Sequence, residues 1–337
     1  MLNIETIKKY DKKCMYEVYD KWPEIAEKQF NSELEKIKIR GIKHIVFSGM
    51  GGSGTLGDIF ASIFSSTNIH VDVVKGYKLP KTISKNTLVI VTSVSGNTAE
   101  TVSVLNEAIK NKCKIISFFS GGKIMRICKK NKIEYRKIPK HVNPRTSLAS
   151  YLYSMLRVLE PILPISEKEI KYSITKLKNL KKNICSDNLQ SNNLSLKLAQ
   201  SISQIPIVYY PFGLGAVAIR FKNSLQENAK MHIMVEDVIE AAHNGIVAWE
   251  NNSKITRPIL IQGKNDNIKT KKHLKVLKKF LHGKKIKYDE VISLEGDILT
   301  KIINLIYLFE YVTIYRAIIN QVDPFPVKPI DFIKKRV

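Results

Sequence analysis

The sequence predicts an α/β fold in which mostly parallel sheets are covered by helices on both faces. In the first half, short apolar segments rich in β-branched residues alternate with segments of helical periodicity, and in the second half the same plan recurs. Parallel strands need a long return connection, which is commonly a helix, and such sheets are buried on both faces. A chain of 337 residues is long enough for two such units.

Five strands and four helices are expected in the first half. Each strand is a short apolar run bounded by charged or turn-forming residues, and each crossover between parallel strands is expected to be right-handed. The predicted strands are residues 43–48, 69–74, 87–92, 114–119 and 133–138, and the predicted helices are residues 54–65, 98–111, 122–130 and 146–161.

The second half follows a stretch rich in Lys, Asn and Ser at residues 162–200. Its helical periodicity, in EIKYSITKLKNL, indicates a connecting helical region. IPIVYYPFGLGAVAIRFKNSLQENAK then repeats strand, glycine-containing turn and helix, RPILIQG and KIKYDEVISL supply further strands, and residues 297–320 form a long helix. We therefore expect an N-terminal domain over residues 1–160, a helical connection over residues 161–198 and a C-terminal domain over residues 199–337.

Composition favours a globular cytoplasmic protein. Hydrophobic residues make up 44% of the chain, and no apolar run reaches the roughly 18 residues that span a bilayer, so no membrane partner is expected. The first residues, MLNIETIKKYDKK, lack the apolar core of a signal peptide. The four cysteines are far apart and form no CxxC pair, so reduced thiols are expected instead of a disulfide framework or a cysteine metal site.

The net charge of +25 raises the possibility of nucleic-acid binding. The lysines are spread over separate stretches, such as KEIKYSITKLKNLKKN and KTKKHLKVLKKFLHGKKIK. In the second stretch Leu274, Leu277 and Leu281 recur at helical spacing, which is typical of a solvated helix with one buried stripe. Aromatic and basic residues do not interleave as in a base-stacking surface. A solvated surface is favoured, with attraction of a small anion as the remaining alternative, and no nucleic-acid partner is expected.

The first predicted strand runs into a glycine-rich turn, FSGMGGSG. Gly49, Gly51 and Gly54 have the spacing of a dinucleotide-binding turn, where backbone N–H groups and a helix N-terminus attract phosphate. A dinucleotide site also needs an acidic residue at the end of the second strand, to hold the ribose. Here Asp72 lies in mid-strand and Lys75 follows the strand. A phosphate ligand is therefore favoured over a dinucleotide oxidoreductase.

A second phosphate-binding signal follows the third predicted strand. Ser93, Ser95 and Thr98 share one strand-to-helix turn with a glycine, in the sequence SVSGNT. Helix capping needs only one hydroxyl, whereas a phosphate has several oxygens to satisfy. Neither turn is followed by Lys-Ser or Lys-Thr, which excludes a P-loop.

With these two turns the chain resembles the SIS (sugar isomerase) domain family. SVSGNTAET and GMGGSG carry the resemblance, and NPRTSLASYL, FKNSLQENAK, AHNGIVAWE and VKPIDFIKK extend it, in order, to the archaeal-type bifunctional phosphoglucose/phosphomannose isomerases. The resemblance covers nearly the whole chain. It implies two SIS domains of doubly wound, flavodoxin-like topology, and interconversion of glucose 6-phosphate and mannose 6-phosphate with fructose 6-phosphate.

Aldose–ketose isomerisation needs a base that reaches C1 and C2, a group that opens the sugar ring, and positive charge near the enediolate. The resemblance implies that Glu227 transfers the proton and that His243, supplied by the neighbouring subunit of a homodimer, opens the ring. It assigns ring-opening help to the terminal lysine, matched by Lys334, with Lys335 as the alternative register. Arg145 would stabilise the enediolate or contact the sugar, and the alternative for it is a solvated basic residue of a loop.

The same resemblance implies a site for a phosphorylated hexose. Gly51, Gly52 and Ser53 would line the sugar, while the three hydroxyls of the serine turn would hold the phosphate. No cofactor is implied, and the chain lacks the His/Glu cluster of zinc-dependent mannose phosphate isomerases, so no metal is expected. Val327 stands where the family has a threonine that gives room at C2: it keeps the shape and lacks the hydroxyl.

Two alternatives within the same fold remain. A non-catalytic phosphosugar sensor would need the serine turn but not Glu227 together with His243. Another SIS sugar-phosphate isomerase would share the loops and act on a different sugar.

Overall fold

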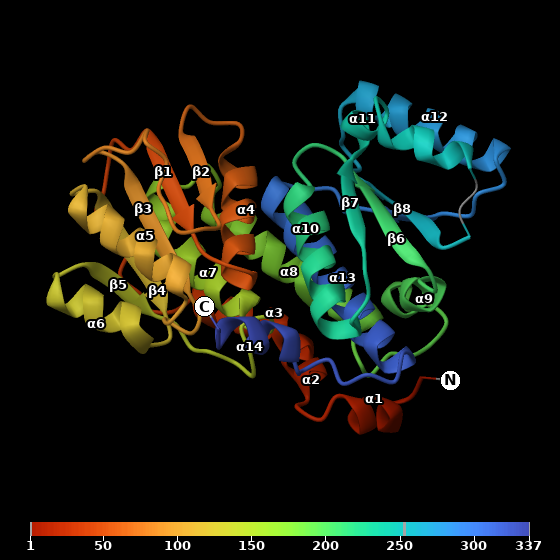
Figure 1. The fold of residues 1–337 in the computed structure, drawn as a ribbon, viewed down its shortest axis with the longest axis horizontal. Helices are drawn as coiled ribbons and strands as arrows, with labels where there is room; N and C mark the ends of the chain where they lie inside the picture. The colour runs from red at the N-terminus through yellow and green to blue at the C-terminus, as the bar shows by residue number, and fades with distance from the viewer. Residues whose placement is uncertain (1, 252–253, 337) are drawn as a thin grey trace. The chain divides into compact units, whose positions relative to one another are not determined.

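Contacts group the chain into two units, each with its own sheet (Figure 1). The computed structural model describes residues 2–251 and 254–336. The N-terminal unit comprises Lys21–Lys178 with Asp297–Thr300, and the C-terminal unit comprises the rest of the described chain.

The N-terminal unit is built on five parallel strands in the order β2-β1-β3-β4-β5. This is the flavodoxin-like order, and it confirms the predicted doubly wound fold. The strands are β1 (His44–Ser48), β2 (His70–Val74), β3 (Leu88–Ser93), β4 (Lys114–Phe119) and β5 (Glu134–Lys137). The helices are α3 (Trp22–Phe30), α4 (Gly52–Phe64), α5 (Ala99–Lys110), α6 (Gly122–Lys130) and α7 (Leu148–Leu159), followed by η1 (Glu160–Ile162) and α8 (Glu167–Ile184), which continues into the other unit.

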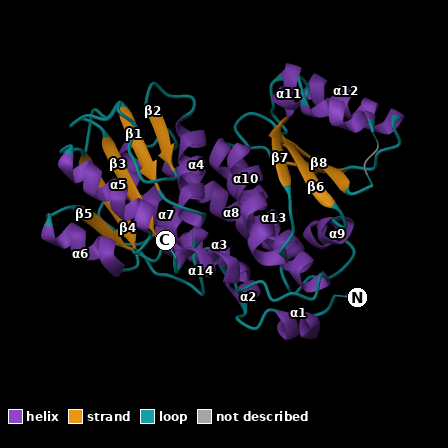
Figure 2. Ribbon diagram, in the orientation of Figure 1, coloured by secondary structure: helices purple, strands orange, loops and turns teal. Residues whose placement is uncertain are grey.

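Helices cover both faces of this sheet (Figure 2). On one face Val46 and Val89 pack with Leu105 of α5 and Ile124 of α6. On the other face the ring of Phe47 stacks on Phe60 of α4, with centroids 5.0 Å apart. Successive residues of β1 therefore point to opposite layers, as expected for a strand buried on both sides.

The strand order places two loops side by side. β1 pairs with β2 on one side and with β3 on the other, so the chain changes direction across the sheet between β1 and β3. In such sheets ligands bind at this switch point, beyond the carboxyl ends of the strands. The two loops that begin there are the glycine turn and the serine turn identified in the sequence.

The C-terminal unit carries four parallel strands in the order β7-β6-β8-β9. These are β6 (Ile205–Tyr210), β7 (Met234–Asp237), β8 (Thr256–Gln262) and β9 (Asp289–Ile292). Its helices are α1 (Ile4–Tyr10), α2 (Met15–Asp20), α9 (Leu194–Ser201), α10 (Gly215–Ser224), η2 (Leu225–Ala229), α11 (Val238–Ala241), η3 (Gly245–Glu250), α12 (Ile268–Gly283), α13 (Ile298–Ile319) and α14 (Lys328–Lys334). The sequence did not predict β7, because this edge strand, MVED, lacks a continuous apolar run.

Helix α13 corrects the expectation that no segment is long and apolar enough to cross a membrane. It has 22 residues with a mean hydropathy of 1.5 in its most apolar window, and 89% of that window is buried inside the protein. Glu310 on this helix is buried and hydrogen-bonded to three side chains. The helix is thus the interior helix of a folded unit, and this carboxylate finds its partners within the chain.

Contacts group residues 2–20 with the C-terminal unit. The Tyr19 hydroxyl donates to Glu310 Oε2 (2.7 Å), and the Tyr307 hydroxyl donates to the Tyr19 carbonyl (2.8 Å). Asp20 accepts a hydrogen bond from Ser186 Oγ (2.6 Å). These long-range bonds could not be read from the sequence of the segment itself. The boundaries near residues 160 and 198 stay predictions.

Candidate active site

The glycine turn joins β1 to α4 and requires glycine at two positions. Gly51 has φ +54°, in the region that favours glycine. A Cβ on Gly49 would lie 2.8 Å from the backbone of Ser53, closer than atoms can pack. The backbone therefore turns tightly before α4, and Gly52 and Ser53 form its first turn. This is the arrangement in which N–H groups face an anion.

Lys75, which follows β2, is engaged in an ion pair. Its Nζ lies 2.6 Å from Asp58 Oδ2 on α4. Burial raises the pKa of Asp58 above its usual range, although Lys75 acts in the opposite direction. The end of β2 thus carries a paired lysine and no carboxylate that could hold a ribose, which supports the exclusion of a dinucleotide site.

The serine turn joins β3 to α5 and is shaped by its own hydroxyls. The Gly96 N–H donates to Ser93 Oγ (3.1 Å), which also lies 3.0 Å from Thr98 Oγ1. Ser93 is buried and Ser95 is exposed. Thr98 is the N-cap residue of α5, yet its side chain makes no capping hydrogen bond. Ser93 and Thr98 therefore set the loop, while Ser95 lies at the surface.

The first turn of α6 fixes the serine turn from the side. The Ile124 N–H donates to the Gly96 carbonyl (2.9 Å), and the Lys123 N–H donates to Asn97 Oδ1 (2.8 Å). Gly96 has φ +67°, and a Cβ there would lie 1.7 Å from the Gly121 carbonyl oxygen. Only glycine fits this contact, so the close approach of the serine turn to Gly121 depends on Gly96.

Arg145 lies in the loop after β5 and is buried, with 5% of its surface exposed. The loop is closed by its own polar groups: the Thr146 N–H donates to Asn143 Oδ1 (3.0 Å), and Ser147 Oγ donates to the Asn143 carbonyl (2.8 Å). This burial does not fit a solvated loop arginine. β5 is parallel to its neighbours, so this loop leaves the sheet at the same edge as the glycine and serine turns.

Glu227 lies on η2, a π-helical turn that continues α10. Such turns are rare and are found frequently at functional sites. Two amides fasten the turn to α13 and the residue that follows it: Asn228 Nδ2 donates to Thr313 Oγ1 (2.8 Å), and Asn320 Nδ2 donates to the Ala229 carbonyl (3.4 Å). The position of Glu227 is thus set by a buried helix.

Lys230 fastens the chain's last segment to the same turn. It has φ +58°, and its Nζ donates to the carbonyls of Glu227 and Pro326, the latter at 2.8 Å. Val327 follows immediately and is the N-cap residue of α14, which ends at Lys334. The sequence did not single out Lys230, because its partners are backbone carbonyls that carry no residue signature.

A buried positive charge lies beneath this turn. Arg220 Nε on α10 donates to Glu310 Oε1 (2.5 Å). Burial by itself lowers the pKa of Arg220, but Glu310, Tyr19 and Glu227 together outweigh this effect, so this pKa ends above its usual value. Glu227 is therefore within electrostatic reach of a guanidinium that stays charged.

His243 is exposed and lies at the other end of the C-terminal sheet from Glu227. α10 and η2 start at the carboxyl end of β6 and return toward its amino end, where Glu227 lies. His243 instead comes after β7 and α11, beyond the carboxyl end of the sheet. At about 3.3 Å per residue, β7 alone spans roughly 13 Å between the two edges. The structure does not bring Glu227 and His243 of one unit together.

The predicted site residues thus fall into two groups. The residues expected to hold the sugar phosphate, together with Arg145, lie in loops that follow the carboxyl ends of the N-terminal strands. Glu227 and Lys334 lie in the C-terminal unit, on two segments that the hydrogen bonds of Lys230 connect. The side chains of Lys334 and Lys335 are both exposed. Their roles stay predictions.

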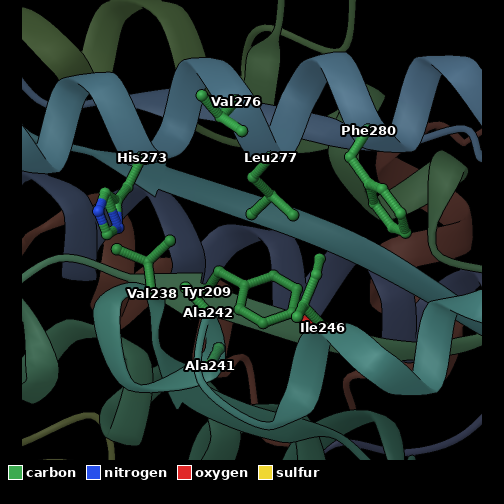
Figure 3. Close-up of a pocket in the computed structure, with 9 residues that line it drawn as sticks. All are labelled: Tyr209, Val238, Ala241, Ala242, Ile246, His273, Val276, Leu277 and Phe280. Carbon is green, nitrogen blue, oxygen red and sulfur yellow. The ribbon is translucent and has the colours of Figure 1, made fainter.

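A pocket of about 330 Å³ in the C-terminal unit does not suit a phosphosugar. It lies between α12 and the segment before and after His243 (Figure 3), and Tyr209, Leu277 and Phe280 turn apolar surfaces toward it. Among its lining residues Tyr209 and His273 are the two whose side chains carry polar atoms. A hexose phosphate needs several hydrogen-bond donors, which this wall lacks.

Comparison with known proteins agrees with this geometry. Residues 38–144 match the SIS domain, and residues 191–337 match the bacterial phospho-glucose isomerase C-terminal SIS domain. A bifunctional phosphoglucose/phosphomannose isomerase from Aquifex aeolicus (strain VF5) is 31% identical over 303 residues, which cover 88% of this chain and 90% of that protein. The chain belongs to the bifunctional phosphoglucose/phosphomannose isomerase family.

A second relative and a solved structure of the same fold are also similar to this chain. The bifunctional phosphoglucose/phosphomannose isomerase of Caldicellulosiruptor bescii is 28% identical over 313 residues, covering 89% of this chain and 91% of that protein. A hypothetical protein from Thermus thermophilus shares the fold with a TM-score of 0.72 at 12% identity, covering 99% of this chain and 89% of that chain. The resemblance found in the sequence is thereby confirmed.

Replacing Ser95 tests the serine turn. Ser95→Ala removes an exposed hydroxyl that accepts the Asn97 N–H at 3.2 Å. A hydrogen bond to a charged group contributes roughly 1.5–3 kcal/mol, so KM for a hexose phosphate should rise between about ten- and hundredfold. Steady-state kinetics would measure it, with Ser65→Ala, an exposed serine at the end of α4, as control. An unchanged KM would place the phosphate elsewhere.

Proposed function

We propose that this protein interconverts fructose 6-phosphate with glucose 6-phosphate and with mannose 6-phosphate. The observation that carries the proposal is the match to the isomerase family over about nine-tenths of the chain. The serine turn at the switch point supports a phosphate ligand, and the anchored Glu227 turn supports a positioned base. The cytoplasm is the proposed site of action.

The chemistry follows from what each group can do. The phosphate is held by Ser93, Ser95 and Thr98 with the N-terminus of α5, and the sugar lies against the glycine turn. His243, with help from Lys334, opens the ring by moving a proton between the ring oxygen and the anomeric hydroxyl. Glu227 takes the proton from one of C1 and C2 and returns it to the other.

Arg145 stabilises the negative charge that develops during this transfer. In the enediolate the charge sits on the oxygens at C1 and C2, and a buried guanidinium interacts with it more strongly than a solvated one. The 5% exposure of Arg145 supports this role. Val327, beside the Glu227 turn, gives room at C2 without a hydroxyl to hold the mannose epimer.

A homodimer completes the site in this proposal. Glu227 lies toward the amino ends of the C-terminal strands and His243 beyond their carboxyl ends, so a single unit does not present both to one sugar. The exposure of His243 suits a residue that serves a neighbouring subunit. A two-fold dimer would exchange these histidines and build two equivalent sites.

The activity is tested with coupled assays on fructose, glucose and mannose 6-phosphates. We expect turnover of all three, with full activity after treatment with a chelator, because proton transfer by side chains needs no Lewis acid. Binding of these sugars without turnover would indicate a phosphosugar sensor. Turnover that is lost on chelation would contradict the mechanism.

Mixing two inactive variants tests the dimer. Glu227→Gln and His243→Ala chains, once they exchange subunits, should recover about a quarter of wild-type activity, because half of the dimers are mixed and each has one intact site. The control replaces the second chain with a Glu227→Gln/His243→Ala double variant, which restores no site. Absence of recovery despite measured subunit exchange would mean that each chain builds its own site.

A further inference from the structure

In the N-terminal unit, three side chains with metal-ligating atoms meet near the amino ends of two neighbouring strands. His44 lies on β1, and His70 and Asp72 lie on the edge strand β2. The parallel register pairs His44 with His70, and Asp72, two residues along, points to the same face as His70. The parallel register therefore brings His70 and Asp72 close to His44, although they lie 26 and 28 positions away in the sequence.

The distances suit one small cation. His44 Nε2 lies 2.9 Å from Asp72 Oδ2, and His70 Nε2 lies 3.4 Å from the same oxygen. All three ligand atoms lie within 4.8 Å of one another. With bonds of about 2.0–2.1 Å, the ligands of a tetrahedral Zn²⁺ are separated by roughly 3.3 Å. Small side-chain rotations would bring the three atoms to that spacing.

A buried hydroxyl orients the first ligand. His44 Nδ1 lies 3.2 Å from Thr87 Oγ1, and the Ser84 N–H donates to the same oxygen (2.9 Å). Thr87 can also accept the Nδ1–H of His44, an arrangement that leaves Nε2 unprotonated toward Asp72. A hydrogen bond on the far nitrogen is the usual support of a metal-bound histidine.

The cluster is open on one side. The His44 side chain is 14% exposed, Asp72 31% and His70 64%, so an ion can enter from solution and water can complete its coordination. Two imidazoles with one carboxylate favour Zn²⁺ and other late first-row ions over Mg²⁺ and Ca²⁺, which prefer oxygen ligands alone. We propose that His44, His70 and Asp72 bind a divalent late first-row metal ion, with Zn²⁺ the best match.

The ion would link the edge strand to the rest of the sheet and take no part in isomerisation. The glycine turn begins after Ser48, four residues from His44 along β1, which is roughly 13 Å. A metal that binds only the folded state raises its stability in proportion to the logarithm of its concentration. The site therefore acts on the stability of β2, and the inference stands independently of the proposed reaction.

Titration of the tag-free, metal-stripped full chain with Zn²⁺ tests the proposal. Calorimetry should show one ion per chain, and the melting temperature should rise with Zn²⁺ while turnover at the assay temperature stays unchanged. His70→Gln and Asp72→Asn should each weaken binding at least tenfold. His282→Gln, an exposed histidine on α12, is the control that should bind as the wild type does.

Co²⁺ gives a second readout, because its absorption bands report nitrogen and oxygen ligands directly. His70 is the most exposed of the three ligands, so the metal-free His70→Gln variant should have the same melting temperature as the metal-free wild type. A loss of metal binding in this variant can then be attributed to the lost ligand and not to unfolding. Zn²⁺ binding that is equally strong in His70→Gln and Asp72→Asn, or no binding at all by the wild type, would overturn the site.

Discussion

The C-terminal unit of this molecule depends on one buried ion pair, between Arg220 and Glu310. Both side chains are almost fully enclosed, at 2% and 1% exposure. Glu310 also accepts hydrogen bonds from Tyr19 and Ser224, which satisfies the buried carboxylate. Losing one partner of such a pair typically costs about 3–5 kcal/mol, because the other charge is left buried. The pair thus joins α2, α10 and α13 as one block.

The placement of Glu227 follows from that block. The π-helical turn η2 continues α10, so whatever fixes α10 against α13 also fixes the carboxylate. Asn228 and Asn320 repeat the attachment, and Lys230 adds the segment that leads to α14. In the N-terminal unit the equivalent constraint is steric, since Gly96 must touch the loop at Gly121. Each unit thus holds its own candidate residues in position through its fold, which is what proton transfer at a fixed geometry needs.

The sequence predicted most of the N-terminal unit because its signals are local. Short apolar strands, and glycines and hydroxyls at strand ends, are visible without knowing what they contact. The edge strand β7 was missed because a half-exposed strand keeps little apolar pattern. The helix α13 was predicted, but its apolar length was underestimated, because Glu310 interrupts the apolar run and the partners of Glu310 lie far away in the sequence. The cluster of His44, His70 and Asp72 forms through the register of two strands, which spacing along the chain does not reveal. The contact of Lys230 with the Pro326 carbonyl is hidden for a similar reason, because a backbone carbonyl has no residue signature.

The central claim is that Glu227 moves a proton between C1 and C2, and solvent deuterium reports that transfer directly. With fructose 6-phosphate in D₂O, nuclear magnetic resonance should detect deuterium at C2 of the glucose 6-phosphate formed by the wild type, since a carboxylate exchanges its proton with water. Glu227→Gln, which keeps the shape of the side chain, should still bind the sugar phosphate but incorporate no deuterium. Incorporation at the wild-type rate in Glu227→Gln would contradict the account, because the base would then be another residue.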